Sequence, residues 1–180
     1  MENIELLSRY GSAGGEAQLD KLGGVAWQAR VARIKGRVRI MAEQLINIAA
    51  ARYRARAEPL IAEDGSFGEF CARFAFTETE DQLNAINDVV DDLASGKATD
   101  RLICGDVGFG KTEVALRAAF IAAMAGYQVA LVAPTTLLAR QHGKVFVERF
   151  AGFPVKIGVL SRMTSTADAK VIRENIASGE

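Results

Sequence analysis

The sequence has few of the residues on which several classes of functional site depend. Its 180 residues include one histidine, His142, and two cysteines, Cys71 and Cys104, which lack CxxC spacing. This argues against a zinc site built from cysteine or histidine and suits a reduced, cytoplasmic protein. No apolar run reaches the length of a membrane-spanning helix, and the N-terminus lacks the layout of a secretory signal. The sequence therefore predicts a cytoplasmic protein with no membrane partner.

An excess of charge of either sign is also absent. Lys and Arg total 22, Asp and Glu total 22, and the formal net charge is +0, so total charge indicates nothing about partners. Hydrophobic residues make up 49% of the chain and charged residues 24%, which is typical of a globular protein with a core. The length leaves room for one full domain, or for one partial domain with appendages.

What the sequence does contain is a complete phosphate-binding motif. The pattern G-x-x-x-x-G-K-[ST] is matched in full by Gly105, Asp106, Val107, Gly108, Phe109, Gly110, Lys111 and Thr112. We predict a short buried strand over residues 101–104 before the loop, and after it a helix over residues 113–124 that Gly126 stops. Glycines let successive backbone N–H groups turn toward one centre, and the helix N-terminus adds partial positive charge.

This motif predicts binding of ATP with Mg²⁺. Lys111 is expected to reach the β- and γ-phosphates, and the Thr112 hydroxyl is expected to hold the metal ion. These two residues are the predicted catalytic residues. The predicted cofactor site comprises the eight residues of the motif together with the next residue, Glu113.

Apolar periodicity and turn signals organise the rest of the motif-bearing region. Helices are predicted over residues 80–94, 136–150 and 168–177, the first with a capping box from Thr77 to Glu80 or with Thr79 as its cap. Further strands are predicted over residues 128–133 and 155–160. Strands that alternate with helices indicate an α/β fold with a parallel sheet in three layers, of which about three strands are present. No Asp-Glu pair ends an apolar strand after the phosphate loop, so the second carboxylate on the magnesium side is missing.

A long amphipathic helix is predicted over residues 25–58, ended by Pro59. Its apolar positions are spaced alternately by four and three residues: Trp27, Val31, Ile34, Val38, Met41, Leu45 and Ile48. The opposite face is basic and includes Arg30, Arg33, Lys35, Arg37 and Arg39. We favour a helix that packs lengthwise against a neighbouring domain with its basic face in solvent; contact with nucleic acid and a coiled coil are the alternatives. Residues 60–68 are predicted to form a turn or linker that marks a domain boundary.

Several segments resemble the first motor domain of the bacterial transcription-repair coupling factors, a family of superfamily 2 DNA translocases. The first two are Phe74-x-Phe76-x-x-Thr79-x-Asp81-Gln82 and the stretch from Asp100 through the phosphate motif to Glu113-Val114-Ala115. The third is Pro134-Thr135-Thr136-Leu137-Leu138-Ala139-Arg140-Gln141-His142. Two others match where that family leaves its RNA-polymerase-interacting module: Ile4-Glu5-Leu6-Leu7-Ser8-Arg9-Tyr10 and Lys21-Leu22-Gly23-Gly24-Val25-Ala26-Trp27.

The resemblance implies an incomplete RecA-like P-loop NTPase domain behind the long helix. Residues 1–24 would end the polymerase-interacting module, residues 25–68 would form the connecting helix and linker, and residues 69–180 would form the truncated first motor domain. The implied partners are double-stranded DNA and, through the full-length parent protein, RNA polymerase and excision-repair proteins. Gly143 departs from the family, which usually has a bulky residue there.

The resemblance also implies residue roles. Gln82 would read the adenine edge, with Phe74 or Phe76 stacked on the base; the alternative is that the phenylalanines are core residues and Gln82 is a surface helix residue. The implied nucleic-acid contacts are Pro134, Thr135, Thr136, Arg140, Gln141, Ser161 and Arg162. Capping of a helix is the alternative, or a simultaneous, role for the two threonines.

Two classes of function remain open at this stage. The first is a fragment of an ATP-dependent DNA translocase that displaces stalled RNA polymerase and couples transcription to nucleotide excision repair. The second is a nucleotide-binding module without turnover, and another superfamily 2 helicase is an alternative family. We expect the parent protein to be an enzyme and this chain alone to be inactive and of limited stability, because the acidic motif and the second motor domain are missing.

Overall fold

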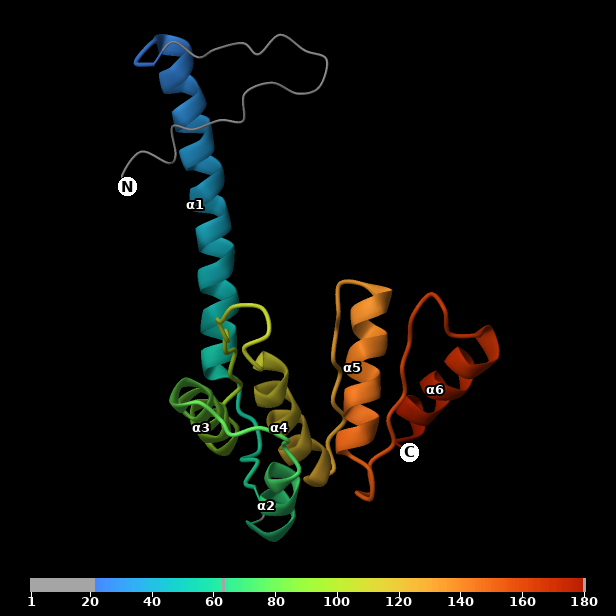
Figure 1. Ribbon diagram of the computed structural model, residues 1–180. Coiled ribbons are helices and arrows are strands. Elements are labelled where there is room, and N and C mark those ends of the chain that lie inside the picture. Colours follow the sequence, from blue (N-terminus) through green and yellow to red (C-terminus); the bar gives the residue numbers. More distant parts are fainter. Residues whose placement is uncertain (1–21, 63, 180) are drawn as a thin grey trace. The chain divides into compact units, whose positions relative to one another are not determined.

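The computed structural model describes residues 22–62 and 64–179, and the regular secondary structure of these residues is helical (Figure 1). The helices are α1 (Val25–Arg54), α2 (Asp64–Ala72), α3 (Glu80–Ala94), α4 (Lys111–Met124), α5 (Thr136–Arg149) and α6 (Thr166–Ser178). The chain divides into two compact units, Met1–Ala51 and Arg52–Glu180. The segment around residues 4–10 that resembles a polymerase-interacting module lies outside the described residues.

Helix α1 confirms the predicted long helix, although it ends at Arg54 and not at residue 58. None of its residues is buried. The middle of the apolar stripe is open, with Ile34 53% and Leu45 65% exposed. Among the helices that the structure describes, none is both long enough and apolar enough to cross a bilayer.

Helix α2 occupies a segment for which the sequence predicted a turn or linker, and this prediction is wrong from Asp64 onward. The helix carries Phe67 and Phe70 on one face, where they contact the Phe120 ring at centroid distances of 6.2 and 4.3 Å. Burial of two aromatic rings outweighs the weak helix propensity of Gly65 and Gly68. Tertiary packing therefore makes a helix where local composition favoured a turn.

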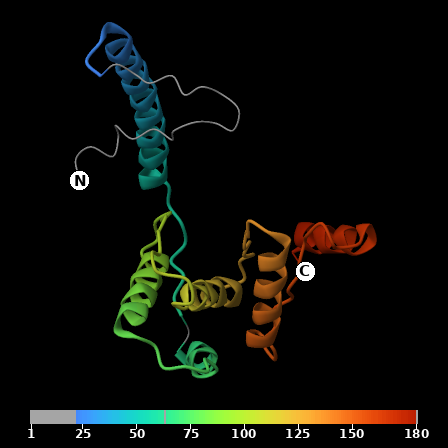
Figure 2. The same ribbon diagram turned by 45° about the horizontal axis from the view of Figure 1, so that its top comes forward.

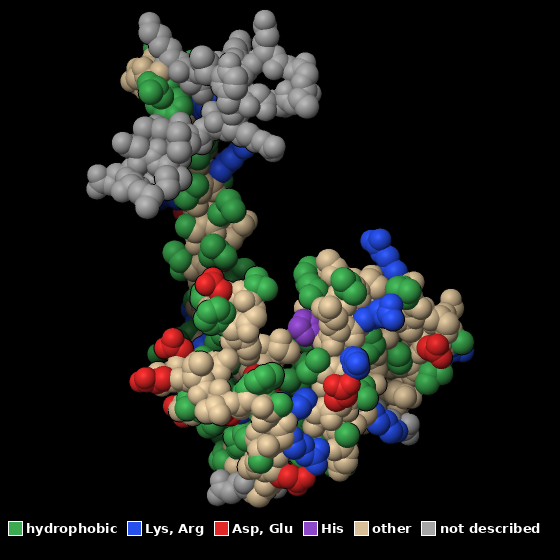
Figure 3. Space-filling model, in the orientation of Figure 1, with side chains coloured by type: hydrophobic (Ala, Val, Ile, Leu, Met, Phe, Trp, Pro, Cys, Tyr) green, Lys and Arg blue, Asp and Glu red, His purple; other side chains and the backbone are tan. Residues whose placement is uncertain are grey.

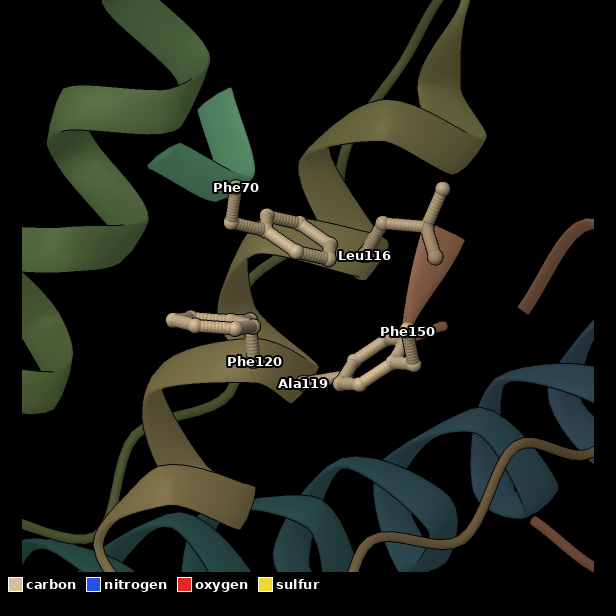
Figure 4. Close-up of a cluster of buried hydrophobic side chains, with 5 residues drawn as sticks. All are labelled: Phe70, Leu116, Ala119, Phe120 and Phe150. Carbon is tan, nitrogen blue, oxygen red and sulfur yellow. The ribbon is translucent and has the colours of Figure 1, made fainter. Parts of the chain in front are cut away.

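The core of the second unit lies on α4 (Figure 4). Its fully or nearly fully buried members are Phe70, Leu116, Ala119, Phe120 and Phe150. Rings from α2, α4 and the end of α5 meet there, with the Phe70 and Phe150 centroids 5.1 Å apart. Helix α4 also packs against α2 and α3. The helix that follows the phosphate loop is thus the most buried element, so the core holds the loop's C-terminal anchor in place.

The start of α3 is set by a capping box at Thr79. The Thr79 Oγ1 accepts a hydrogen bond from the Gln82 N–H at 3.2 Å, and the Gln82 Oε1 accepts one from the Thr79 N–H at 2.9 Å. The predicted alternative cap is therefore the correct one, and the box predicted from Thr77 to Glu80 is wrong. Of the apolar residues of this helix, Ile86 is buried, whereas Leu83 is 42% exposed.

The three predicted strands run as irregular backbone in the described part of the chain (Figure 2). There the ladder pairing is limited to one isolated antiparallel bridge, between Arg56 and Lys97. Leu102 is 84% and Val132 91% exposed, so the expected burial of residues 101–104 is not found. Arg101 is instead joined to Asp88 of α3 at 2.9 Å. Because a sheet is stabilised by pairing between strands, apolar sequence alone does not make one, and the parallel sheet stays a prediction.

Helices α5 and α6 confirm the last two predicted helices, and both have side-chain caps. The Thr135 Oγ1 accepts from the Leu138 N–H at 3.2 Å, and the Ser165 Oγ accepts from the Asp168 N–H at 3.1 Å. The backbone between these helices lies close to both. A Cβ atom on Gly143 would lie 2.5 Å from the Val159 Cγ2, and one on Gly158 would lie 2.8 Å from the Ile172 Cγ2.

Candidate nucleotide-binding site

The phosphate loop ends on the N-terminus of α4, as the motif predicts. Gly108 and Gly110 have φ angles of 86° and 72°, values in the left-handed region that favours glycine. Gly110 is the N-cap, so the N–H groups of Lys111 and Thr112 belong to the first helical turn and have no acceptor within the helix. The loop therefore places free backbone donors at the positive end of a helix dipole, an arrangement that binds anions.

Lys111 is folded back over its own loop. Its Nζ donates hydrogen bonds to the carbonyl oxygens of Gly105 and Asp106, both at 2.6 Å. In the described residues it makes no salt bridge, so its charge is not neutralised by a carboxylate. Phosphate oxygens are stronger acceptors for an ammonium group than carbonyl oxygens are, and the Lys111 head already lies beside the loop that would cradle them.

The donors present fit a magnesium–nucleotide complex. The loop supplies an ammonium group, glycine N–H groups and the half-buried Thr112 hydroxyl. Within residues 22–62 and 64–179, no group of three or more His, Cys, Asp or Glu side chains is placed to hold a metal ion. In nucleotide complexes Mg²⁺ is usually bound through few protein ligands and the phosphates themselves, and a hydroxyl such as that of Thr112 can be one of those ligands. When bound, Mg²⁺ would neutralise charge on the phosphates, while Thr112 would hold the metal.

Gln82 connects α3 to the phosphate loop. While its Oε1 closes the capping box, its Nε2 donates to the Phe109 carbonyl at 2.9 Å. A Cβ atom on Gly110 would lie 2.5 Å from this Nε2, so the loop approaches Gln82 closely at a glycine. The structure thus brings Gln82 and the loop together, and the reading of adenine by this side chain stays a prediction.

The two candidate stacking residues differ in their surroundings. Phe76 is 74% exposed. The Phe74 ring contacts it edge-on at 5.6 Å and also lies 5.7 Å from the Arg149 guanidinium. Phe74 therefore belongs partly to the packed interior, as one of the two sequence interpretations expected, and Phe76 is the ring that solvent reaches.

Glu113 differs from the other predicted cofactor residues, because its carboxylate is 4% exposed and bonded to Arg117 and Arg149. These arginines are not among the site residues predicted from the sequence, and neither is Glu78, which also pairs with Arg117. The i,i+4 spacing of Glu113 and Arg117 on one helix was a signal for their pairing. No local signal in the sequence pointed to Arg149, which lies at the end of another helix.

The predicted nucleic-acid contacts form two groups, one at the start of α5 and one in the turn before α6. Thr135 acts as the cap of α5, and Thr136 is the first residue of that helix. One turn further on, the Arg140 Nη1 lies 3.8 Å from the Met163 Sδ, which joins α5 to the turn that follows the third predicted strand. In that turn the Thr164 N–H donates to the Ser161 carbonyl at 3.1 Å. Pro134, Gln141 and Arg162 are exposed.

Side chains of opposite charge gather over different helices of the second unit. Figure 3 shows acidic side chains over α3 and most Lys and Arg side chains over α5, α6 and the segments beside them. On α3 the acidic residues are Glu80, Asp81, Asp88, Asp91 and Asp92. The predicted phosphate contacts belong to α5 and to the segments beside α5 and α6, where positive charge predominates, and positive charge is what a nucleic-acid backbone requires.

Comparison with known proteins places the chain in a family. The model of the family "DEAD/DEAH box helicase" matches residues 79–178, which include Gln82, the phosphate loop and α5. The chain belongs to this helicase family. Membership implies a RecA-like fold and nucleotide binding with a metal ion, to which the described residues contribute the helices and the phosphate loop.

Individual relatives within this helicase family agree with the resemblance stated from the sequence. The chain is 49% identical over 184 residues to a protein named transcription-repair-coupling factor from Rickettsia bellii (strain RML369-C), with 100% of this chain covered. Proteins of the same name from Haemophilus influenzae and Escherichia coli (strain K12) are 45% identical over 179 residues and 43% identical over 181 residues, covering 99% and 100% of the chain. In all three cases the chain spans 16% of the relative's length. The resemblance to this family of factors is confirmed.

Proposed function

We propose that this chain carries the nucleotide-binding start of the first motor domain of an ATP-dependent DNA translocase. In this proposal the whole protein displaces stalled RNA polymerase and couples transcription to nucleotide excision repair. The observation that carries the proposal is the phosphate loop on the N-terminus of α4, with Lys111 folded over it. The relatives' names support the specific process. A cytoplasmic location is part of the same proposal, since the polymerase and DNA of a bacterium lie there.

Each loop residue has a role that its position supports. Gly108 and Gly110 allow the backbone N–H groups to face the phosphates, and Lys111 exchanges its two carbonyl acceptors for the β- and γ-phosphates. The Thr112 hydroxyl, one residue along the first turn, holds Mg²⁺. In phosphoryl transfer the protein contributes mainly positioning and charge stabilisation. Because no Asp-Glu pair ends an apolar strand after the phosphate loop, turnover by this chain alone is expected to stay near background.

The DNA partner is proposed to lie at the N-terminal end of α5. The Thr135 and Thr136 hydroxyls, with Arg140, Gln141 and the Ser161–Arg162 turn, would hold the phosphates of one strand. The contact between Arg140 and Met163 supports a single surface formed by both groups. Capping by Thr135 uses one acceptor lone pair of its hydroxyl, and the hydroxyl hydrogen remains available to a phosphate oxygen.

The division into an end of a polymerase module, a connecting helix and a motor domain belongs to the same proposal. The exposed stripe on α1 supports it, because a helix of 30 residues with no buried residue needs a neighbour to cover its apolar face. We assign this stripe to packing between domains and its basic face to solvent.

The experiment uses the full-length gene product and a transcription complex stalled on DNA by nucleotide omission. ATP-dependent release of the transcript is expected from the wild-type protein and is expected to be lost with Lys111→Ala. Lys170→Ala on α6 removes a lysine that pairs with Glu174 of the same helix, and serves as the matched control. DNA-dependent ATP hydrolysis without transcript release would favour another superfamily 2 helicase, and nucleotide binding without hydrolysis would favour a binding module.

A further inference from the structure

The helix that follows the phosphate loop takes part in a largely buried ionic cluster, made of Glu78, Glu113, Arg117 and Arg149. Glu113 and Arg117 are each 4% exposed, and the Arg149 side chain is 13% exposed. The Glu113 Oε2 accepts from the Arg149 Nη1 at 2.7 Å, and its Oε1 accepts from the Arg149 Nη2 at 3.0 Å. A bidentate pair of this kind fixes the orientation of both groups as well as their distance.

The pair joins two helices that carry different parts of the proposed site. Glu113 lies in the first turn of α4, directly after Thr112, whereas Arg149 is the last residue of α5. The Arg149 Nη2 also donates to the Phe70 carbonyl at 3.1 Å, and its guanidinium lies 4.6 Å from the Phe70 ring centroid. Contacts with Phe70 of α2 therefore fix the Arg149 guanidinium, which in turn fixes the Glu113 carboxylate.

Arg117 bonds the same carboxylate but from within α4. Its Nε donates to the Glu113 Oε1 at 2.9 Å, and its other end pairs with Glu78, just before the α3 cap. Arg117 belongs to the same helix as Glu113, so its bond to the Glu113 carboxylate cannot fix that helix relative to α5. Of the two arginines on Glu113, Arg149 alone links the loop's helix to α5.

A buried ion pair is an inefficient way to stabilise a core, because desolvation offsets much of the attraction and well-packed apolar residues do as well. What such a pair provides is a defined geometry. Here the geometry is imposed on the turn that contains Thr112 and Lys111. The demands of Mg²⁺ are strict, since it takes near-ideal octahedral geometry with ligands at about 2.1 Å.

We infer that Arg149 is a positioning residue which, through Glu113, holds the first turn of α4 where the Thr112 hydroxyl can bind the metal ion of a magnesium–nucleotide complex. This rests on the proposed nucleotide binding. The position of Arg149 matters less for the glycine N–H groups of the loop, which would bind the phosphates directly, without the metal ion. Loss of Arg149 therefore weakens the contribution of Mg²⁺ to nucleotide affinity much more than it weakens binding of the metal-free nucleotide.

The test compares ADP affinity with Mg²⁺ and with EDTA, by titration calorimetry on the chain as it stands. The readout is the ratio of the two affinities. For the wild type, Mg²⁺ raises the affinity. For Arg149→Gln the ratio falls by about tenfold or more, as is typical when a partner that orients a metal ligand is removed, while the EDTA affinity stays within about twofold of the wild type.

Arg117→Gln is the matched control, because it removes the other, more deeply buried arginine from the same carboxylate and leaves the link to α5. It should keep the wild-type ratio. Arg149→Lys keeps the charge but loses the two-pronged geometry, and should give an intermediate ratio. If Arg149→Gln does not fold, as judged by its circular dichroism, Arg149→Lys decides the question, and a wild-type ratio for that variant overturns the inference.

Several other results would also overturn the inference. An unchanged ratio for Arg149→Gln, equal losses with and without Mg²⁺, or an equal fall for Arg117→Gln would show that the cluster serves only the fold. Failure of the wild-type chain to bind ADP at all would overturn the proposed nucleotide binding, and the inference with it. That failure is distinct, because it leaves no ratio to compare in any variant.

Discussion

At the scale of single residues, Gly143 sets how closely α5 approaches the backbone that follows it. A Cβ atom there would lie 2.5 Å from the Val159 Cγ2, and valine is too short and too stiff to move its methyl group away. We expect Gly143→Ala to destabilise the second unit by about 1–3 kcal/mol, the usual cost of overpacking. The measurement is the free energy of unfolding from urea denaturation.

The matched control is Gly36→Ala, which lies in a helix where an added Cβ meets nothing within 4 Å. Alanine should raise the stability of α1 by about 0.5–1 kcal/mol, because glycine loses more backbone entropy in a helix. If Gly143→Ala proves as harmless as Gly36→Ala, the close packing of α5 on Val159 is wrong.

The lowered pKa values of two carboxyl groups, Glu78 and Asp92, lead to a prediction of how stability depends on pH. A hydrogen bond from Arg117 holds the pKa of Glu78 below its ordinary value, and one from Arg101 does the same for the pKa of Asp92. A carboxyl with a depressed pKa in the folded state adds stability above its unfolded pKa, and this is lost as pH falls through the folded pKa. The melting temperature should therefore fall with pH from about pH 5 downward.

The combined variant Glu78→Gln/Asp92→Asn checks this assignment. It should be less stable than the wild type at neutral pH and should lose less stability on acidification, so the two curves converge at low pH. Parallel curves over the whole range would assign the acid sensitivity to other groups.

At the scale of elements, most helices could be predicted from the sequence, but the residues against which they pack could not. The stretches that became α1, α4 and α5 carry local signals: a 3.6-residue period, the threonine cap at residue 135, and the phosphate loop with Gly126 beyond it. Helix α2 was missed because Gly65 and Gly68 favour a turn locally, while contacts of Phe67 and Phe70 with Phe120, which is far away in the sequence, favour a helix.

The predicted strands form no sheet among the described residues, so the sheet stays a prediction. Leu102 and Val132 lie in apolar runs that suit a buried strand, but burial depends on neighbouring strands that no local pattern specifies. In the candidate site, the loop and its lysine were predictable because the glycine spacing is their cause. The Glu113–Arg149 pair was not, since it joins residues on two helices.

The basic face of helix α1 allows two interpretations to be compared: packing between domains with this face in solvent, and binding of DNA. Arg33 and Arg37 lie on its exposed basic face. If that face is only solvated, Arg33→Glu/Arg37→Glu should leave the salt dependence of DNA affinity unchanged. Each lost phosphate contact flattens the slope of log affinity against log salt by about one unit. Arg140→Glu on α5 is the positive control and should flatten the slope by about one unit; flattening by about two units in the α1 variant would make α1 a DNA-binding element.

At the scale of the whole molecule, large apolar side chains remain exposed. Examples outside α1 are Leu102, Val107, Phe109, Val132 and Leu137. Because the core gathers on α4 and the described residues form no sheet, we expect a broad thermal transition, a small urea dependence of the unfolding free energy, and association at high concentration. Circular dichroism melts and sedimentation velocity measure these properties. A sharp cooperative melt of a monomer would contradict this expectation.

Nucleotide binding by the phosphate loop is the claim on which the proposals above depend. The most direct measurement is titration calorimetry of Mg-ADP into the wild-type chain, Lys111→Ala and Lys144→Ala. Lys144 is an exposed lysine of α5 that pairs with Glu148 on its own helix, away from the loop. We predict binding by the wild type and by Lys144→Ala, and none by Lys111→Ala. Equal affinity in all three proteins would show that the loop is not the nucleotide site.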